Sequence, residues 1–188
     1  MNLPNKLTMA RIIMIPVFAA AFYLEIIPFN YVIAAAIFAI AAFTDFLDGH
    51  IARKYGLVTD LGKFLDPIAD KVLVSTALIV LLAPISGVAY LPFYCAIFVA
   101  VILARELIVS GFRMVAASKG VVLAADKSGK IKTFVQDVAI VVLLVSMNVN
   151  PANLFYIAGV AILGIATLLT IISGTECIVK NFSVIKTK

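Results

Sequence analysis

Residues 72–104 read VLVSTALIVLLAPISGVAYLPFYCAIFVAVILA, and none of these 33 side chains is Asp, Glu, Lys or Arg. Two further stretches lack charged residues in the same way, at 26–44 and 138–175. A helix needs about 20 apolar residues to cross the hydrocarbon core of a bilayer, so each of the two longer stretches has room for nearly two crossings. Prolines interrupt both, within 84–92 and 148–151. The chain is therefore predicted to cross a membrane several times.

Two segments with few charges, around 12–27 and 131–147, complete the set of spans. We predict an all-α polytopic membrane protein with six transmembrane helices, forming a single domain over residues 1–188. The predicted spans are 9–27, 30–48, 66–83, 91–116, 131–148 and 152–179. The composition agrees, because 64% of the 188 residues are hydrophobic and 13% are charged, with a mean hydropathy of +1.15. Soluble domains contain about 25% charged residues, about twice the fraction found in this chain, and the comparison excludes a water-soluble globule.

All 15 Lys and Arg residues fall on one side of this six-span arrangement. They precede the first helix, lie between the second and third, surround the junction of the fourth and fifth, or follow the sixth. By the positive-inside rule, both termini and the two longer loops face the cytoplasm, which predicts a multi-pass protein of the cell membrane. The net charge of +5 favours anionic lipids as neighbours. No basic helix or aromatic strip outside the spans indicates nucleic acid as a partner.

Five of the ten acidic residues fall within 26 positions, namely Asp45, Asp48, Asp60, Asp66 and Asp70. On helices, the first two are three residues apart and the last two are four apart, so each pair shares one helix face. Four carboxylates brought together at a membrane boundary repel one another and require cations. Oxygen ligands suit Mg²⁺, Mn²⁺ or Ca²⁺, and two such ions can stabilise the attacking and leaving oxygens of a phosphoryl transfer. Phosphate chemistry at the lipid surface is predicted, with Asp60 interpreted as an ordinary interfacial acid.

The residues around these acids complete a longer pattern, Asp45-x2-Asp48-Gly49-x2-Ala52-Arg53-x8-Gly62-x3-Asp66-x3-Asp70. This pattern resembles the signature of the CDP-alcohol phosphatidyltransferase family at every fixed position, and the six-span topology agrees with that family. The resemblance implies an enzyme that passes a phosphatidyl group from a CDP-linked donor to a hydroxyl group and releases CMP.

The resemblance also implies roles for single residues. Two ions, Mg²⁺ or Mn²⁺, would be bound by Asp45, Asp48, Asp66 and Asp70. Asp70 would also act as the base that deprotonates the acceptor hydroxyl. The CDP part of the donor, CDP-diacylglycerol, would lie against Gly49, Arg53 and Thr59, where a guanidinium can pair with a diphosphate oxygen.

The opening string Asn5-Lys-Leu-Thr8-Met-Ala-Arg11 resembles the start of bacterial members of the family, where this segment lies near the donor. The resemblance implies that Thr8 and Arg11 bind CDP-diacylglycerol. From the residues alone, Thr8 suits a helix N-cap and Arg11 suits an interfacial anchor, and these two interpretations have equal weight with binding.

A second group of polar residues is basic. Arg105 and Arg113 lie on nearly one face of the fourth predicted helix, where ionisable groups are costly and usually functional. Lys130 and Lys132 belong to the string Ser128-Gly-Lys-Ile-Lys-Thr133, a glycine with polar donors at a helix start, which suits an anion. We predict that these four residues bind the phosphate of a negatively charged acceptor. Glycerol 3-phosphate fits this pocket, whereas choline and ethanolamine do not. A structural ion pair between Arg105 and its neighbour Glu106 is the alternative for that arginine.

Two other functions compete with this hypothesis. A relative that accepts inositol phosphate would share the basic pocket. A small cation transporter would place acids near helix centres and show inverted symmetry between its halves, and the sequence shows neither. Glycines in the last span, at 159, 164 and 174, are typical of close helix packing, and we expect a homodimer.

Overall fold

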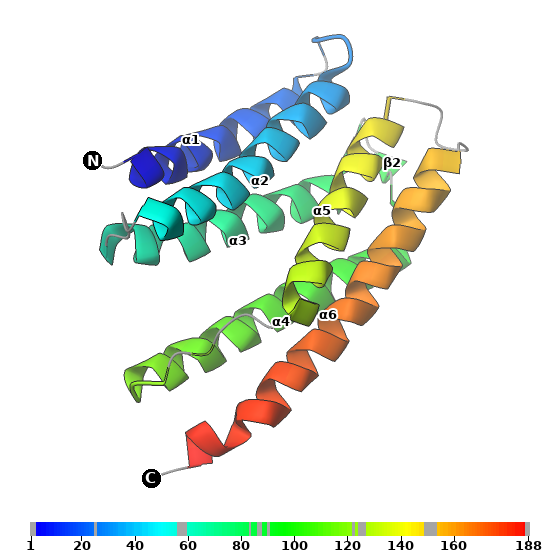
Figure 1. Ribbon diagram of the computed structural model, residues 1–188. Helices are drawn as coiled ribbons and strands as arrows, with labels where there is room; N and C mark the ends of the chain where they lie inside the picture. The colour runs from blue at the N-terminus through cyan, green and yellow to red at the C-terminus, as the bar shows by residue number, and fades with distance from the viewer. Residues whose placement is uncertain are drawn as a thin grey trace.

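The computed structural model describes residues 3–24, 26–55, 60–82, 84–85, 88–89, 91–121, 123, 127–148 and 154–186. Side chains are described for these ranges except 3–4, 45–55, 60–61, 63–64, 84–89, 127 and 183–186. Six α-helices account for nearly all of the described residues (Figure 1). They are α1 (Leu3–Tyr23), α2 (Asn30–Tyr55), α3 (Asp60–Leu82), α4 (Phe93–Ser118), α5 (Lys127–Ser146) and α6 (Leu154–Lys186). The predicted all-α fold is confirmed.

Three segments of these helices are long and apolar enough to cross a membrane, and they are Asn5–Tyr23, Phe93–Ser118 and Leu154–Phe182. Asn30–Thr44 is a shorter apolar helix. The charged residues of α3 and α5 are concentrated in the first half of each helix, so their uninterrupted apolar parts are shorter than a full crossing. The chain is a polytopic membrane protein, and α3 and α5 are its two helices with polar first halves.

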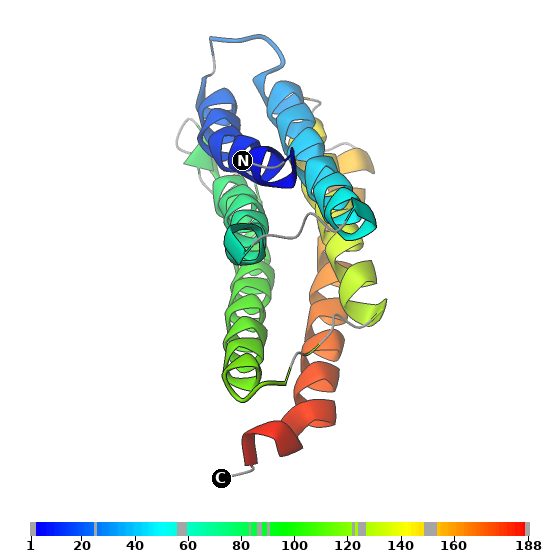
Figure 2. The same ribbon diagram turned by 60° about the vertical axis from the view of Figure 1, so that its left-hand side comes forward.

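The helices pack around a core of large apolar side chains. Phe18 of α1 lies 6.0 Å from Phe38 of α2 between ring centroids, and Leu78, Ile102 and Leu143 bring α3, α4 and α5 into the same cluster. Figure 2 shows α6 running along the molecule beside α4 and α5, and contacts between these helices agree.

Glycine allows the closest of these helix contacts. A Cβ atom added at Gly159 of α6 would lie 2.8 Å from Cδ2 of Leu143 on α5, which is too close for any real side chain. The absence of a side chain therefore sets the spacing of α5 and α6 at this level.

Short connections join two pairs of helices at one end of the bundle. Between α1 and α2, Phe29 adopts a φ of 59°, and the side chain of Asn30 donates to the carbonyl of Phe22 over 2.8 Å. Between α3 and α4, β1 (Pro84–Ile85) pairs antiparallel with β2 (Val88–Ala89), with Pro84 opposite Ala89. The prolines predicted a break at this place but not the small hairpin.

Several helices extend beyond the predicted spans at the opposite end. The second span was predicted to end at 48, whereas α2 continues to Tyr55, and the third was predicted from 66, whereas α3 begins at Asp60. The first helix begins at Leu3 instead of 9. The start of α1, the facing ends of α2 and α3, the end of α4 and the end of α6 all lie toward the left and lower left in Figure 1. Much of the polar sequence is thus carried on helix extensions at this end.

Candidate active site

The carboxylates of the sequence pattern lie on two helices. Asp66 and Asp70 are one turn apart on α3, and both side chains are half-buried. Asp45, Asp48, Gly49 and Arg53 all belong to α2, but their side chains lie outside the described residues, as does Thr59 entirely.

The hydroxyl of Thr8 on α1 donates to Oδ1 of Asp66 over 2.5 Å. Thr8 is buried and is the sixth residue of α1, so its interpretation as an N-cap is wrong. The reason is that the helix begins at Leu3, so Thr8, which was predicted to lie just before the first span at 9–27, is inside it. Thr8 thereby connects α1 to a carboxylate of α3.

Arg11 lies one turn further along α1 and is completely buried. Its Nε donates to the carbonyl of Ala41 on α2 over 3.3 Å. An interfacial anchor extends its charged head into water, so this buried position does not fit an anchor.

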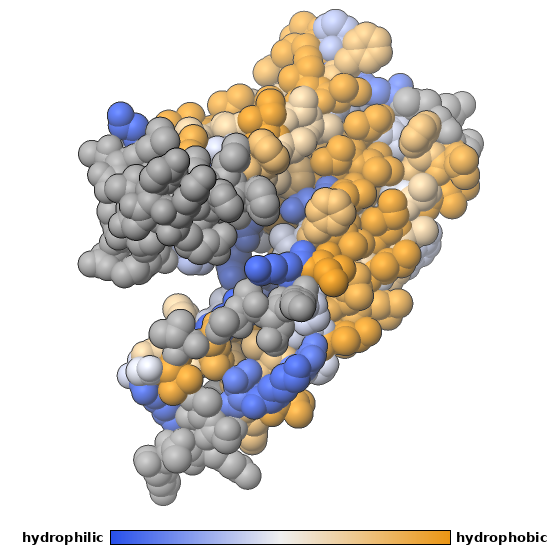
Figure 3. All heavy atoms as spheres, viewed as in Figure 1, coloured by the Kyte–Doolittle hydropathy of each residue, from blue (hydrophilic) through white to orange (hydrophobic). Residues whose placement is uncertain are grey.

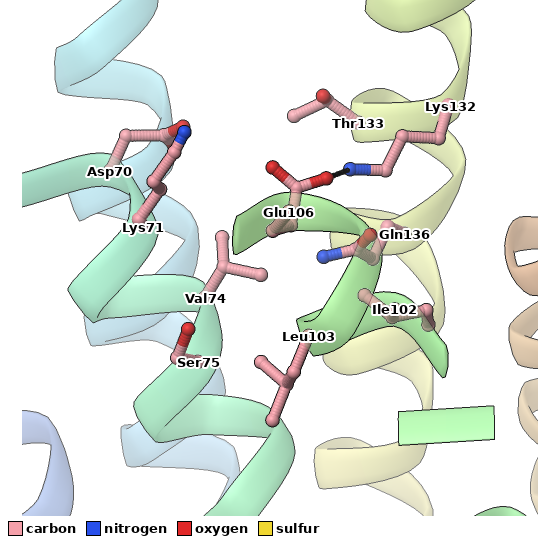
Figure 4. A pocket seen from close by; sticks show the side chains of 10 residues that line it. All are labelled: Asp70, Lys71, Val74, Ser75, Ile102, Leu103, Glu106, Lys132, Thr133 and Gln136. Carbon is pink, nitrogen blue, oxygen red and sulfur yellow. Dashed lines mark hydrogen bonds and ion pairs between the residues drawn. The ribbon is translucent and has the colours of Figure 1, made fainter. Parts of the chain in front are cut away.

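A narrow pocket lies between α3, α4 and α5 beside these carboxylates (Figure 4). Asp70 and Lys71 approach it from α3, and Glu106 projects into it from α4. The remaining lining residues are Val74, Ser75, Ile102, Leu103, Lys132, Thr133 and Gln136. Asp70 therefore belongs both to the acidic face of α3 and to the wall of the pocket.

Lys132 of α5 is the most enclosed charged group of the pocket, with 3% of its surface exposed. Its ammonium group forms a hydrogen-bonded ion pair with Oε1 of Glu106, the contact drawn as a dashed line in Figure 4. A buried cation is stable only where an anion compensates it, and Glu106 supplies that charge.

Arg105 faces away from the pocket, toward α6. Its Nε donates to the carbonyl of Thr170 over 3.1 Å, and Nη2 donates to the hydroxyl of Ser173 over 2.8 Å. A Cβ atom at Gly174 would lie 2.8 Å from Cγ of Arg105, so that glycine leaves room for the arginine stem. Nη1 pairs with Glu106 over 3.0 Å, which is the ion pair considered from the sequence.

Two further cations lie around the pocket. Lys71 donates to the hydroxyl of Ser110 on α4 over 2.5 Å. The charges of Glu106 and Asp70 attract its ammonium group, and those of Arg113 and Lys132 repel it. Nε of Arg113 is buried and has no hydrogen-bond partner among the described residues. Sequence reasoning missed Lys71, although its position directly after Asp70 was a usable signal.

The four predicted acceptor residues are thus placed differently from one another. Lys132 lines the pocket, Arg113 lies near Lys71, Arg105 binds α6, and Lys130 is exposed on α5. Their role in acceptor binding stays a prediction.

The donor atoms on α3 fit a hard divalent cation, because carboxylate oxygens are the ligands that Mg²⁺ and Mn²⁺ prefer. Within the part of the chain whose side chains are described, no three His, Cys, Asp or Glu residues form a metal-binding group. Asp66 and Asp70 can supply part of a ligand set, and α2 carries the two other acids of the pattern.

Comparison with known proteins bears on the whole chain. The sequence profile of a family described as CDP-alcohol phosphatidyltransferase matches residues 1–172. A Bacillus subtilis protein named CDP-diacylglycerol--glycerol-3-phosphate 3-phosphatidyltransferase is 42% identical, over 99% of this chain and 98% of its own length. A Rickettsia bellii protein of the same name is 45% identical, over 92% of this chain and 91% of its own. A Mycobacterium tuberculosis protein named probable phosphatidylglycerophosphate synthase is 40% identical, over 95% and 81%.

Proposed function

Since the chain belongs to the CDP-alcohol phosphatidyltransferase family, we propose that it transfers the phosphatidyl group of CDP-diacylglycerol to glycerol 3-phosphate, giving phosphatidylglycerophosphate and CMP. The prediction of an enzyme of this family is confirmed, and the cation transporter is set aside. The names of the Bacillus subtilis and Rickettsia bellii relatives, which align along 98% and 91% of their own lengths, support this donor and acceptor. The name of the Mycobacterium tuberculosis relative supports phosphatidylglycerophosphate as the product.

The observation that carries the proposal is a pocket lined by two ammonium groups, of Lys71 and Lys132, and two carboxylates, of Asp70 and Glu106. Lys71 and Lys132 line it, and a phosphate monoester supplies the negative charge that two ammonium groups attract. We place a hydroxyl of the same small molecule at the carboxylate of Asp70, which lines the same pocket. An acceptor with a hydroxyl and a phosphate on a short carbon skeleton suits this arrangement, and glycerol 3-phosphate is such a molecule.

In the proposed reaction, Asp70 takes the proton of the acceptor hydroxyl. The hydroxyl oxygen attacks the phosphorus that bears the diacylglycerol and forms a new P–O bond. The bond between that phosphorus and the oxygen of the CMP phosphate breaks, and CMP leaves with the electron pair. The proton passes from Asp70 to water before the next turnover.

We assign the metal sites to Asp45, Asp48, Asp66 and Asp70, and two bound Mg²⁺ or Mn²⁺ ions would supply positive charge to the attacking and leaving oxygens. Gly49, Arg53 and Thr59 are assigned to the CDP part of the donor. Thr8 and Arg11 are also assigned to the binding of CDP-diacylglycerol. The hydrogen bond from Thr8 to Asp66 supports this for Thr8, and the burial of Arg11 inside the helix bundle is compatible with it.

We further propose that residues 1–188 act as one domain, as a homodimer, with both termini and the site on the cytoplasmic side of the cell membrane. Exposed cysteines report the orientation because Cys95 and Cys177 are both buried. Lys119→Cys, after α4, should react with a membrane-impermeant maleimide only in inside-out vesicles, and Phe29→Cys, in the exposed turn between α1 and α2, only in right-side-out vesicles. The reverse pattern would contradict the orientation. Crosslinking in native membranes tests the dimer.

The reaction is tested with purified protein in mixed micelles containing CDP-diacylglycerol and Mg²⁺. Glycerol 3-phosphate, inositol 1-phosphate and glycerol are supplied separately, and CMP release is followed. We expect CMP with glycerol 3-phosphate and at least a hundredfold less with glycerol, which lacks the phosphate, a loss of about 2.7 kcal/mol of transition-state stabilisation. CMP release with inositol phosphate only would assign the other acceptor, and no CMP with any of the three would overturn the enzyme reaction.

A further inference from the structure

Glu106 is an acid inside a pocket that the proposed function requires to bind an anion. It projects from α4 between Lys71 on one side and Lys132 on the other (Figure 4). A carboxylate at that place repels a phosphate unless it performs another task. The contacts of Glu106 identify that task.

A single oxygen of Glu106 connects two cations. Oε1 accepts hydrogen bonds from the ammonium group of Lys132 on α5 and from Nη1 of Arg105 on its own helix. Arg105 is itself fixed to α6 through Thr170 and Ser173. The ammonium group of Lys132 is thus connected to α6 by a chain of hydrogen bonds that passes through Glu106 and Arg105.

Lys132 needs such a support because its side chain is long and almost entirely enclosed. An ammonium group has three N–H donors, and its bond to Glu106 uses one of them. A lysine stem without a fixed partner samples many rotamers, so the phosphate would have to order it on binding. With Glu106 in place, that ordering is already done when the acceptor arrives.

From these contacts we infer that Glu106 is a positioning residue, which fixes the ammonium group of Lys132 for the phosphate of the acceptor. The inference rests on the proposed function, since it assigns the pocket to the acceptor. In this role Glu106 acts through Lys132 and not through the reacting hydroxyl or the donor. Its loss should therefore affect acceptor binding and leave the chemical step nearly intact.

The test compares Glu106→Gln, Lys132→Met and the double variant in the CMP assay. Glu106→Gln retains the shape and an accepting oxygen but removes the charge. We expect it to raise KM for glycerol 3-phosphate about tenfold or more, while kcat and KM for CDP-diacylglycerol change less than threefold. Lys132→Met should raise the same KM. The KM of the double variant should not exceed that of Lys132→Met alone, because both changes act on the same interaction between Lys132 and the phosphate.

Glu176→Gln is the matched control. Glu176 of α6 also accepts from a lysine, Lys180, and from a residue of α5, Ser128, but it does not line the pocket. Its KM for glycerol 3-phosphate should equal that of the wild type. Glu106→Asp retains the charge and is used if Glu106→Gln does not fold. Its KM for glycerol 3-phosphate should lie between those of the wild type and Lys132→Met.

The outcomes separate the two proposals. If the wild type releases no CMP with glycerol 3-phosphate or inositol phosphate, the proposed function fails. If the wild type is active but Glu106→Gln has an unchanged or lower KM, or if the single effects multiply in the double variant, the positioning role fails alone. With inositol phosphate as the active acceptor, the same comparison is made with that substrate.

Discussion

The acids of α3 and the cations of the neighbouring pocket lie side by side, yet the protein handles their charges differently. The hydrogen bond described for Asp66 comes from a neutral hydroxyl, that of Thr8. Lys132, in contrast, is paired with a full negative charge inside the protein, that of Glu106. A carboxylate held by a neutral donor keeps its charge for a cation from solution, whereas a compensated lysine can be buried during folding. Asp66 is thus arranged to bind a cation after folding, whereas Lys132 is paired with its anion as the fold forms.

Withdrawal of divalent metal tests the acidic region most severely. EDTA should abolish CMP release, because the four carboxylates proposed as ligands would, without cations, neither hold the donor nor offset its charge. Added Mg²⁺ or Mn²⁺ should restore the rate. Full activity after exhaustive chelation would show that the acids do not work through metals. The fold should persist throughout, since the described core is apolar.

Asp70→Asn should lower kcat by about a thousandfold, within the range expected for loss of a general base, with further loss if a metal ligand is also removed. The thermal unfolding midpoint should stay close to that of the wild type. Asp60→Asn, at the start of the same helix, is the control and should retain its rate. A rate for Asp70→Asn within tenfold of the wild type would contradict the assigned base.

Thr8→Val should lower the affinity for Mn²⁺ by about 10- to 100-fold, the usual effect of removing a partner of a metal-ligating carboxylate. Free Mn²⁺ is measured by its electron paramagnetic resonance signal, with purified protein and neither substrate present. Thr8→Ser should restore the affinity because it restores the hydroxyl. Thr167→Val removes another buried hydroxyl, one bonded within α6, and should leave Mn²⁺ binding unchanged. Equal affinities for Thr8→Val and the wild type would exclude a link between Thr8 and the metal site.

Gly174→Ala tests the support of the basic region and should have the smallest effect. Its Cβ would lie 2.8 Å from Cγ and 2.9 Å from Nε of Arg105, an arginine bonded to Thr170 and Ser173. Crowding of this kind costs about 1–3 kcal/mol, seen as a lower unfolding midpoint in detergent. Gly164→Ala on the same helix meets Phe98 at an ordinary 3.7 Å and should unfold like the wild type. Equal midpoints for both variants would contradict the tight contact.

The two regions also differ in how far the sequence predicts them. The helices can be predicted from the long stretches without charged residues. A segment of this length and hydrophobicity crosses a bilayer as a helix, because a helix satisfies its own backbone hydrogen bonds in lipid. The placement of Asp66 and Asp70 on one face of α3 can be predicted from their spacing of four residues on a single helix. The partners of the basic region are 26 residues apart for Glu106 and Lys132, and 39 apart for Lys71 and Ser110.

Such pairs depend on the rotation and packing of three helices, which spacing along the chain does not specify. Arg105 shows the difficulty directly. Its neighbour Glu106 faces the pocket, whereas Arg105, one position and about 100° around the helix, faces α6. A pattern of basic residues predicted the charge of this region but not which members point inward.

The outer surface of the bundle has a kinetic consequence. Among the residues coloured in Figure 3, orange, apolar ones cover most of the face, and blue, hydrophilic ones are most frequent toward the lower left. A protein with this surface stays dissolved in the bilayer, so its donor arrives by lateral diffusion and is counted per area of membrane, while glycerol 3-phosphate is counted per volume of water. Diluting CDP-diacylglycerol with inert lipid should slow the enzyme even when the bulk concentrations of both substrates are held constant.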